Sequence, residues 1–322
     1  MWITDRRFRV FLFVALSVLV ETPSRAQITV APGYTVKVVA EGLDGPEGLG
    51  AHGAGQIAVV EAIDEPGLQF TSATPRLTLV HPSGRRRTLA SETGLLWIDV
   101  VRDPSRGYFV TMLGGNATPQ TRGIRLVLPS GRVSPFLSAN YHFTGIALDR
   151  ETGDLYVSRV SPSSSIDRVE PDGTSSVFLA NVRPEGVVVT RDRILLATLQ
   201  YRPATAPTAF NQVVAINLDT GAETLIATNL GTLVGNIEVS DAGEIFVSDF
   251  KDGKIRRLTP DGTGTYTVSM LAEGLSTSSQ RYPPNTPPYF GLSFNHLAFD
   301  PAGRLYVSDF GAGRLYVIDG LF

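Results

Sequence analysis

The chain has 322 residues, with 28 basic and 31 acidic side chains, a formal net charge of −3 and no cysteine. This acidic balance provides no basic stripe for phosphates, so it argues against nucleic acid as a partner. The absence of cysteine excludes disulfides, thiolate metal sites and cysteine nucleophiles, and it indicates a core that is stable without crosslinks.

Residues 1–26 have the pattern of a secretory signal peptide. A basic start with Arg6, Arg7 and Arg9 precedes an apolar run over 10–20, and Ala26 ends a small-x-small cleavage pattern. The run is shorter than the roughly 20 residues that a membrane span requires. We therefore expect a secreted or periplasmic protein without a membrane anchor after cleavage. The segment removes four basic and two acidic residues, so the net charge changes from −3 to −5.

A phrase of the form Asp-x-x-Gly-x-Leu-Tyr-Val-Ser recurs along the rest of the chain. The clearest copies are residues 300–308 and 149–158, the second with one inserted residue. Four degenerate copies begin at His52, Asp103, Thr190 and Ser240. Six copies spaced by about 40–60 residues are typical of the blades of a β-propeller.

Each repeat predicts four short antiparallel strands, which is the content of one propeller blade. Pro-x-Gly turns such as Pro82–Gly84 and Pro171–Gly173 separate the third and fourth strands. The last repeat provides only three strands before the chain ends, whereas Tyr34–Ala40 matches the fourth strand of other repeats. We expect this N-terminal strand to complete the last blade and close the ring. The sequence thus predicts an all-β, six-bladed propeller, with residues 27–322 forming one domain.

Long connections occur at only two kinds of position in the repeat. They follow the second strand at 62–75, 113–122 and 200–212, and the fourth strand of one repeat at 274–293. Both positions fall on the face where the innermost strands begin. Long loops gathered on one face of a rigid scaffold often carry function. We expect the Pro- and aromatic-rich segment 282–290 to form a wall of a substrate pocket there.

Alignment of the repeats places two successive residues of each blade at the mouth of the central channel. The first position holds Glu47, Ile98, Thr144, Glu185, Gly235 and Asn295. The second position holds Gly48, Asp99, Gly145, Gly186, Asn236 and His296. Carboxylates that face one another across a channel repel unless a proton or a cation lies between them.

Four of these residues, Glu47, Glu185, Asn236 and Asn295, offer the hard oxygen ligands that divalent cations prefer. They suit Ca²⁺ first, with Mg²⁺ and Mn²⁺ as alternatives. Hydrogen bonds to backbone and buried water are the structural alternative. His142 and His296 fall next to the mouth, where an imidazole near neutrality can activate water. They are candidate catalytic residues, with Asp99 as a third.

The repeat phrase resembles the NHL-repeat and gluconolactonase/regucalcin-like superfamily of six-bladed propellers over nearly the whole mature chain. In lactonases of this group, a first-blade Glu and later Asn or Asp residues hold a divalent ion on the axis. Glu47 in Pro46-Glu-Gly48 matches the first of these, and Glu185 in Pro184-Glu-Gly186 falls where the family has Asp-Gly or Asn-Gly. The sequence departs from the pattern because no blade starts with Asn-Gly and Gly235-Asn236 is shifted by one position.

The resemblance implies an exported, divalent-metal-dependent hydrolase that acts on a lactone or related ester, a small-molecule substrate, at the propeller axis. Two alternatives remain open. One is a non-catalytic NHL-type propeller that binds a protein, a glycan or a small molecule. The other is a metal-free lyase or condensing enzyme similar to strictosidine-synthase-like proteins, with Glu185 as the acid or base.

Overall fold

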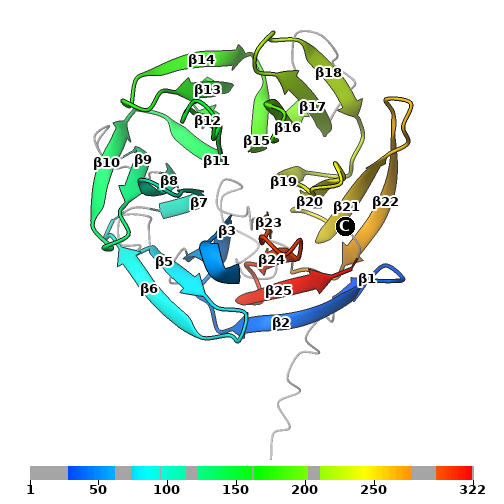
Figure 1. Cartoon of the computed structure of the whole chain (residues 1–322), viewed down its shortest axis with the longest axis horizontal. Helices are drawn as coiled ribbons and strands as arrows, with labels where there is room; N and C mark the ends of the chain where they lie inside the picture. The colour runs from blue at the N-terminus through cyan, green and yellow to red at the C-terminus, as the bar shows by residue number, and fades with distance from the viewer. Residues whose placement is uncertain are drawn as a thin grey trace, which may run out of the picture.

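The computed structural model describes residues 28–61, 74–94, 96–113, 122–161, 163–201, 211–276 and 295–320. Six antiparallel sheets stand in a ring around a central axis (Figure 1). The prediction of an all-β, six-bladed propeller is confirmed. Over the described ranges, the helical structure is a single 3₁₀ turn, η1 (Gly53–Gly55), and no helix has the length and apolar character needed to cross a membrane.

Each blade is built from strands that follow one another in sequence, from the axis outward. Blade 1 contains β3 (Pro46–Ala51), β4 (Ile57–Glu61), β5 (Arg76–Val80) and β6 (Arg86–Ser91). Blade 2 contains β7 (Leu96–Asp103), β8 (Gly107–Leu113), β9 (Gly123–Val127) and β10 (Val133–Ser138). Blade 3 contains β11 (His142–Leu148), β12 (Leu155–Ser161), β13 (Ser165–Val169) and β14 (Ser175–Ala180).

The second half of the ring repeats this order. Blade 4 contains β15 (Arg183–Val189), β16 (Ile194–Tyr201), β17 (Gln212–Asn217) and β18 (Glu223–Ala227). Blade 5 contains β19 (Val234–Val239), β20 (Ile245–Asp249), β21 (Lys254–Pro260) and β22 (Tyr266–Glu273). Blade 6 contains β23 (Leu297–Phe299), β24 (Leu305–Asp309), β25 (Arg314–Asp319) and, on its outer edge, β2 (Thr35–Glu41).

The N-terminal strand closes the ring as predicted. Strand β2 pairs antiparallel with β25, so the earliest and latest strands of the chain share one blade (Figure 1). A two-residue strand that the sequence analysis did not predict, β1 (Thr29–Val30), adds a fifth strand to blade 5 by pairing with β22. The N-terminal segment therefore joins the last two blades to each other.

The hydrophobic core lies between neighbouring blades. Six buried clusters each combine side chains from two consecutive blades. In β4, Ile57 and Val59 pack toward blade 6, whereas Ala58 and Val60 pack toward blade 2. Because both faces of such a strand are buried, its sequence is a continuous apolar run with no polar alternation.

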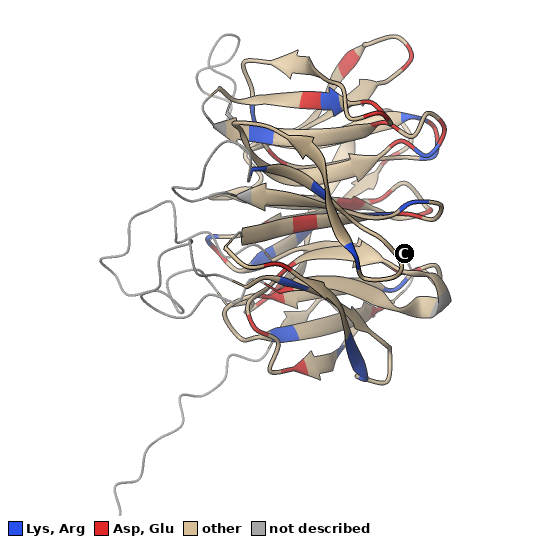
Figure 2. Ribbon diagram, turned by 90° about the vertical axis from the view of Figure 1, so that its left-hand side faces the viewer, with Lys and Arg blue, Asp and Glu red and all other residues tan. Residues whose placement is uncertain are grey.

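The tight turns gather on one face of the disc, which we call the turn face. They connect first to second strands and third to fourth strands, and glycines with positive φ complete them, as Gly84 (φ 82°) and Gly173 (φ 90°) do in the predicted Pro-x-Gly turns. Basic and acidic residues both occur in the turns at this face (Figure 2).

The opposite face, where the inner strands begin, we call the loop face. Register pairs inner-strand starts with second-strand ends there, as in Pro46 with Glu61 and Arg183 with Tyr201. The predicted signal peptide 1–26, the predicted pocket wall 282–290 and most of the long connections lie outside the described residues.

Candidate functional site

The two predicted mouth positions coincide with a break in the inner strand of every blade. In blades 1–5 the pairing between first and second strands shifts at the same point, for example between Pro46 and Leu49 and between Pro184 and Val187. In blade 6, β23 begins at Leu297, directly after Asn295 and His296. Bulges of this kind interrupt the ladder and redirect side chains, and they are frequent beside active sites.

Glycine at the second position lets adjacent inner strands approach closely. A Cβ on Gly48 would lie 2.5 Å from the Cα of Asp99, and a Cβ on Gly186 would lie 2.7 Å from the Cα of Asn236. Both distances are shorter than any real Cβ contact. Three blades therefore place glycine there, and the other three place large polar residues.

These three polar residues meet on the axis. The Nδ1 of His296 lies 3.1 Å from Oδ1 of Asp99 and 3.2 Å from Nδ2 of Asn236. A carboxylate only accepts hydrogen bonds, and the charge-assisted bond is the stronger one, so we place the imidazole proton on Nδ1, donated to Asp99. The basic atom of the His296 ring is then Nε2.

Backbone groups hold this axial trio in place. Asp99 accepts hydrogen bonds from the N–H groups of Val100 (2.8 Å) and Ile146 (3.2 Å), so it links blades 2 and 3. The Oδ1 of Asn236 accepts from the N–H of Leu297 (3.0 Å) and links blades 5 and 6. All three side chains are buried, so water does not compete for these hydrogen bonds.

Hydroxyl groups that end the repeat phrase hold neighbouring blades together beneath the mouth. Ser308 Oγ accepts from the N–H of His296 (2.8 Å) and donates to the carbonyl of Glu47 (2.9 Å). Thr198 makes the same link, from the N–H of Gly186 to the carbonyl of Gly235. Thr111 joins Asp99 to the carbonyl of the next blade in the same way. These bonds satisfy backbone groups that the bulges release from the ladder.

The residues of the first position supply the carboxylates and an amide. Glu47, Glu185 and Asn295 are all buried. The Oε1 of Glu185 accepts a hydrogen bond from Nε2 of Gln200 (2.7 Å). Within the described part of the chain, Oε2 of Glu185 and both amide atoms of Asn295 have no hydrogen-bond partner. Burial raises the pKa of Glu185 to about 8, against the opposing charge of Arg183.

These atoms fit a hard divalent cation. A buried carboxylate oxygen and a buried amide oxygen without partners each carry a desolvation penalty that a cation would relieve. In the described ranges, no group of three His, Cys, Asp or Glu side chains is arranged to hold a metal ion. A cation here would therefore need amide oxygen as well as carboxylate, the ligand types that Ca²⁺ accepts.

His142 lies apart from the axial trio. It begins β11 at the loop face, is half-buried and pairs with Ser161 on the next strand. Burial lowers its pKa, and the positive charge of Arg122 lowers it further. No contact described for His142 connects it to His296, Asp99 or the first-position carboxylates.

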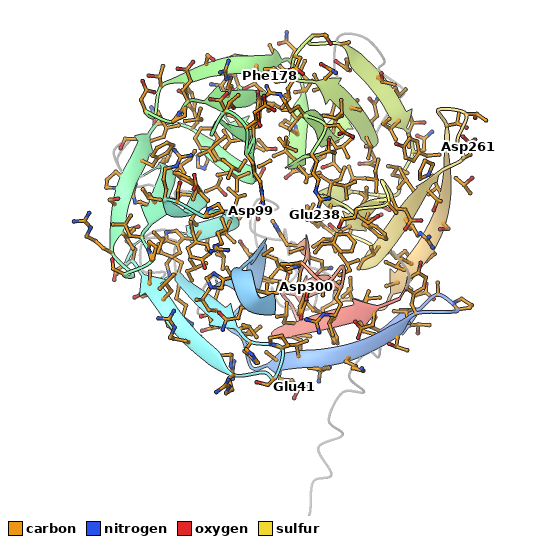
Figure 3. The ribbon with its side chains drawn as sticks, in the orientation of Figure 1. Glu41, Asp99, Phe178, Glu238, Asp261 and Asp300 are labelled. Carbon is orange, nitrogen blue, oxygen red and sulfur yellow. The ribbon has the colours of Figure 1, made fainter. Side chains whose placement is uncertain are left out.

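The axis continues past the trio as an open channel toward the turn face. It forms a cavity of about 1380 Å³, and Asp99 and Asn236 are among its lining residues. Glu238 lies on the opposite side of the channel from Asp99 (Figure 3). Burial raises the pKa of Glu238 to about 8; the N–H of Val239 opposes the shift and the Asp99 charge adds to it.

Sequence reasoning missed Glu238, Gln200 and the bridging hydroxyls. The hydroxyls had a signal, because Ser or Thr ends five of the six repeat phrases while Val60 ends the other. Glu238 also had a sequence signal, since it is a carboxyl in an otherwise apolar inner strand. Gln200 had no sequence signal, because it follows the repeat phrase at the start of a variable connection.

No family model matches the chain, and no curated protein matches its sequence. Solved structures do match. A gluconolactonase from Xanthomonas campestris is 13% identical, with a TM-score of 0.64 over 91% of each chain. A streptogramin B lyase is 13% identical (TM-score 0.58, 89% of this chain and 98% of that one). The calcium structure of a family AA12 enzyme from Trichoderma reesei is 12% identical (0.57, 92% and 98%).

Such identities establish the fold and not the reaction, because one propeller fold carries several chemistries. The matches include a lactonase and a lyase, the two catalytic classes that the sequence analysis left open. The chain shares the fold of these solved structures.

Proposed function

We propose that the protein is a divalent-metal-dependent hydrolase that opens a lactone or related ester at the loop-face end of the axis. The proposal is supported by buried oxygen-bearing side chains at the first position and by an imidazole hydrogen-bonded to a carboxylate at the adjacent second position. Glu47, Glu185 and Asn295 would hold the cation, with Ca²⁺ as the preferred ion. The cation, when bound, polarises the acyl carbonyl oxygen.

His296 is the proposed general base. With Nδ1 donating to Asp99, Nε2 takes a proton from the attacking water, the hydroxide oxygen bonds to the acyl carbon, and the acyl C–O bond breaks. The imidazolium then returns the proton to the leaving alkoxide, which gives a hydroxy acid. Asp99 stabilises the imidazolium and fixes the ring, as a buried carboxylate does in other acid–base pairs. Because Oδ1 of Asn236 accepts from the N–H of Leu297, next to His296, we assign Asn236 to hold the start of this strand and not to bind the metal.

A panel of lactones assayed with and without a chelator tests this proposal. We expect turnover of at least one lactone, which chelation abolishes and added Ca²⁺ restores. The variants Glu47→Gln and Glu185→Gln should each lose turnover while their β-sheet circular dichroism stays that of wild type. Turnover that survives exhaustive chelation would remove the metal from the mechanism.

A metal-free lyase is the second candidate, and the raised pKa of Glu185 favours it. A carboxyl with a pKa of about 8 is protonated at neutral pH and can act as a general acid. Reactions run in ¹⁸O-labelled water separate the two classes. Hydrolysis places one ¹⁸O atom in the product acid, whereas elimination incorporates none.

The proposal includes export, which residues 1–26 would direct. Mass measurement of the protein recovered outside the cytoplasm should then show a chain that begins at Gln27.

A further inference from the structure

The channel on the turn-face side of the axial trio has one exceptional side chain. The residues that follow the bulges at equivalent places in the other five blades are small or apolar: Gly50, Val101, Ala147, Val188 and Ala298. In blade 5 this place is taken by Glu238. Since the blades are repeats of one unit, the carboxyl is a specific departure from the pattern and not a feature of the architecture.

Nothing in the described part of the chain compensates for this carboxyl. The hydrogen bond that it accepts is a long one, 3.4 Å, from the N–H of the adjacent Val239. No ion pair involving Glu238 occurs among the described residues. Glu238 is partly buried in the channel. A ligand that supplies a partner for this carboxyl would offset the cost of its partial desolvation.

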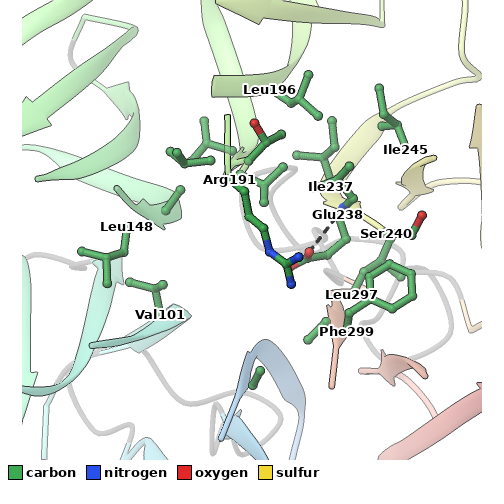
Figure 4. A pocket seen from close by; sticks show the side chains of 18 of the residues that line it. Val101, Leu148, Arg191, Leu196, Ile237, Glu238, Ser240, Ile245, Leu297 and Phe299 are labelled. Carbon is green, nitrogen blue, oxygen red and sulfur yellow. Dashed lines mark hydrogen bonds between the residues drawn. The ribbon is translucent and has the colours of Figure 1, made fainter. Parts of the chain in front are cut away.

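Most side chains around Glu238 are apolar, and Arg191 and Ser240 also line the channel there (Figure 4). Ile237, Leu297 and Phe299 lie beside it, and Val101 and Leu148 face it from the other side of the channel (Figure 4). A metal ion such as Ca²⁺ requires six to eight oxygen ligands, which these walls do not provide. Apolar walls with one well-placed charged group instead suit an organic ligand with an apolar body and one polar end.

The charge of that polar end follows from the surrounding groups. Asp99 adds a second carboxyl to the inner end of the channel. Four arginines line the channel, and of these Arg191 pairs with Asp241 (3.0 Å) and Arg193 pairs with Asp149 (3.1 Å). Seven acidic side chains also line it, so the lining formed by the described residues is net acidic and favours a cationic group.

We propose that this channel is a binding site for an organic ammonium ion, with its cationic group on Glu238 and its apolar body against Val101, Leu148 and Phe299. The ligand enters from the turn face. The site adjoins the proposed hydrolase centre at Asp99 and does not depend on a metal there.

Isothermal titration at pH 9, where Glu238 is ionised and the amines are still protonated, tests the proposal with butyl-, hexyl- and octylammonium and with hexanol as the uncharged match. We expect saturable binding of hexylammonium that tightens with chain length by up to about fourfold per methylene. Hexanol should bind at least about tenfold more weakly, since it lacks the charge.

The variant Glu238→Gln should weaken hexylammonium binding at least about tenfold, whereas the matched variant Glu47→Gln, at the loop-face end, should leave it unchanged. Failure of the hydrolase proposal would not alter either result. The ammonium site is refuted if wild type shows no saturable binding, if hexanol binds as tightly as hexylammonium, or if Glu238→Gln binds like wild type.

Discussion

At the residue scale, the proposed chemistry depends on which nitrogen of His296 carries the proton. Asp99 is positioned by two backbone N–H groups and accepts from Nδ1, so the imidazole has one defined orientation. A carboxylate in this role stabilises the imidazolium that forms during proton transfer.

The variant Asp99→Asn tests this role. It keeps the shape but removes the charge and one of the two oxygens that accept from backbone N–H groups. We expect kcat on an active lactone to fall by about 10²–10⁴-fold with little change in KM. A variant with wild-type kcat would contradict the assignment.

Glu238 gives a prediction about stability and pH. Its pKa is about 8 in the folded protein and has an ordinary value of 4.5, so the folded state holds the proton more tightly than the unfolded chain. Its contribution to the free energy of unfolding is therefore greatest at low pH and is lost as the pH rises through this interval.

Denaturant unfolding of wild type and Glu238→Gln between pH 5 and pH 9 isolates this effect. The glutamine variant cannot ionise, so its stability relative to wild type should increase as the pH rises toward 8 and then level off. A difference between the two proteins that is constant with pH would show that the carboxyl is not withdrawn from water.

At the scale of the strand, the bulges of the inner strands and the hydroxyl groups of the second strands act together. The bulges turn two residues per blade toward the axis, and the hydroxyls satisfy the backbone groups that this leaves without ladder partners. The terminal Ser or Thr of the repeat phrase is thus explained by a bond to the next blade.

Two equivalent serines test whether these hydroxyl bridges between blades stabilise the fold. Ser308→Ala leaves the N–H of His296 and the carbonyl of Glu47 buried without this partner, which should cost about 1–3 kcal/mol. The equivalent Ser158 makes no hydrogen bond through Oγ in the described part of the chain, so Ser158→Ala should cost less than about 1 kcal/mol. Urea unfolding measures both, and equal losses would contradict the bridging role.

Much of the fold and the outline of the site could be predicted at this scale. The repeat phrase, its turns and the unmatched strand at Tyr34–Ala40 gave the blade number and the closure of the ring. The alignment located the mouth positions because repeats place equivalent residues at equivalent sites. The contact between Asp99 and His296, which are 197 residues apart, could not be predicted, since it depends on side-chain geometry at the axis and not on any local pattern.

At the scale of the whole molecule, the ring of blades brings residues from distant parts of the chain to one axis and divides that axis into two ends. Asp99, Asn236 and His296 lie between them. On the loop-face side are Glu47, Glu185 and Asn295, and on the turn-face side is the channel with Glu238. A single closed scaffold can therefore hold a proposed metal centre and an adjoining proposed ligand channel.

The central claim is that the loop-face end of the axis binds a divalent cation. Calcium titration of chelator-treated protein by calorimetry tests it most directly. We predict saturable binding of one Ca²⁺ per chain, weakened at least about 100-fold in the double variant Glu47→Gln/Glu185→Gln and retained in Asp99→Asn. Wild-type protein that takes up no Ca²⁺, Mg²⁺ or Mn²⁺, or a double variant that binds Ca²⁺ as tightly as wild type, would contradict the account.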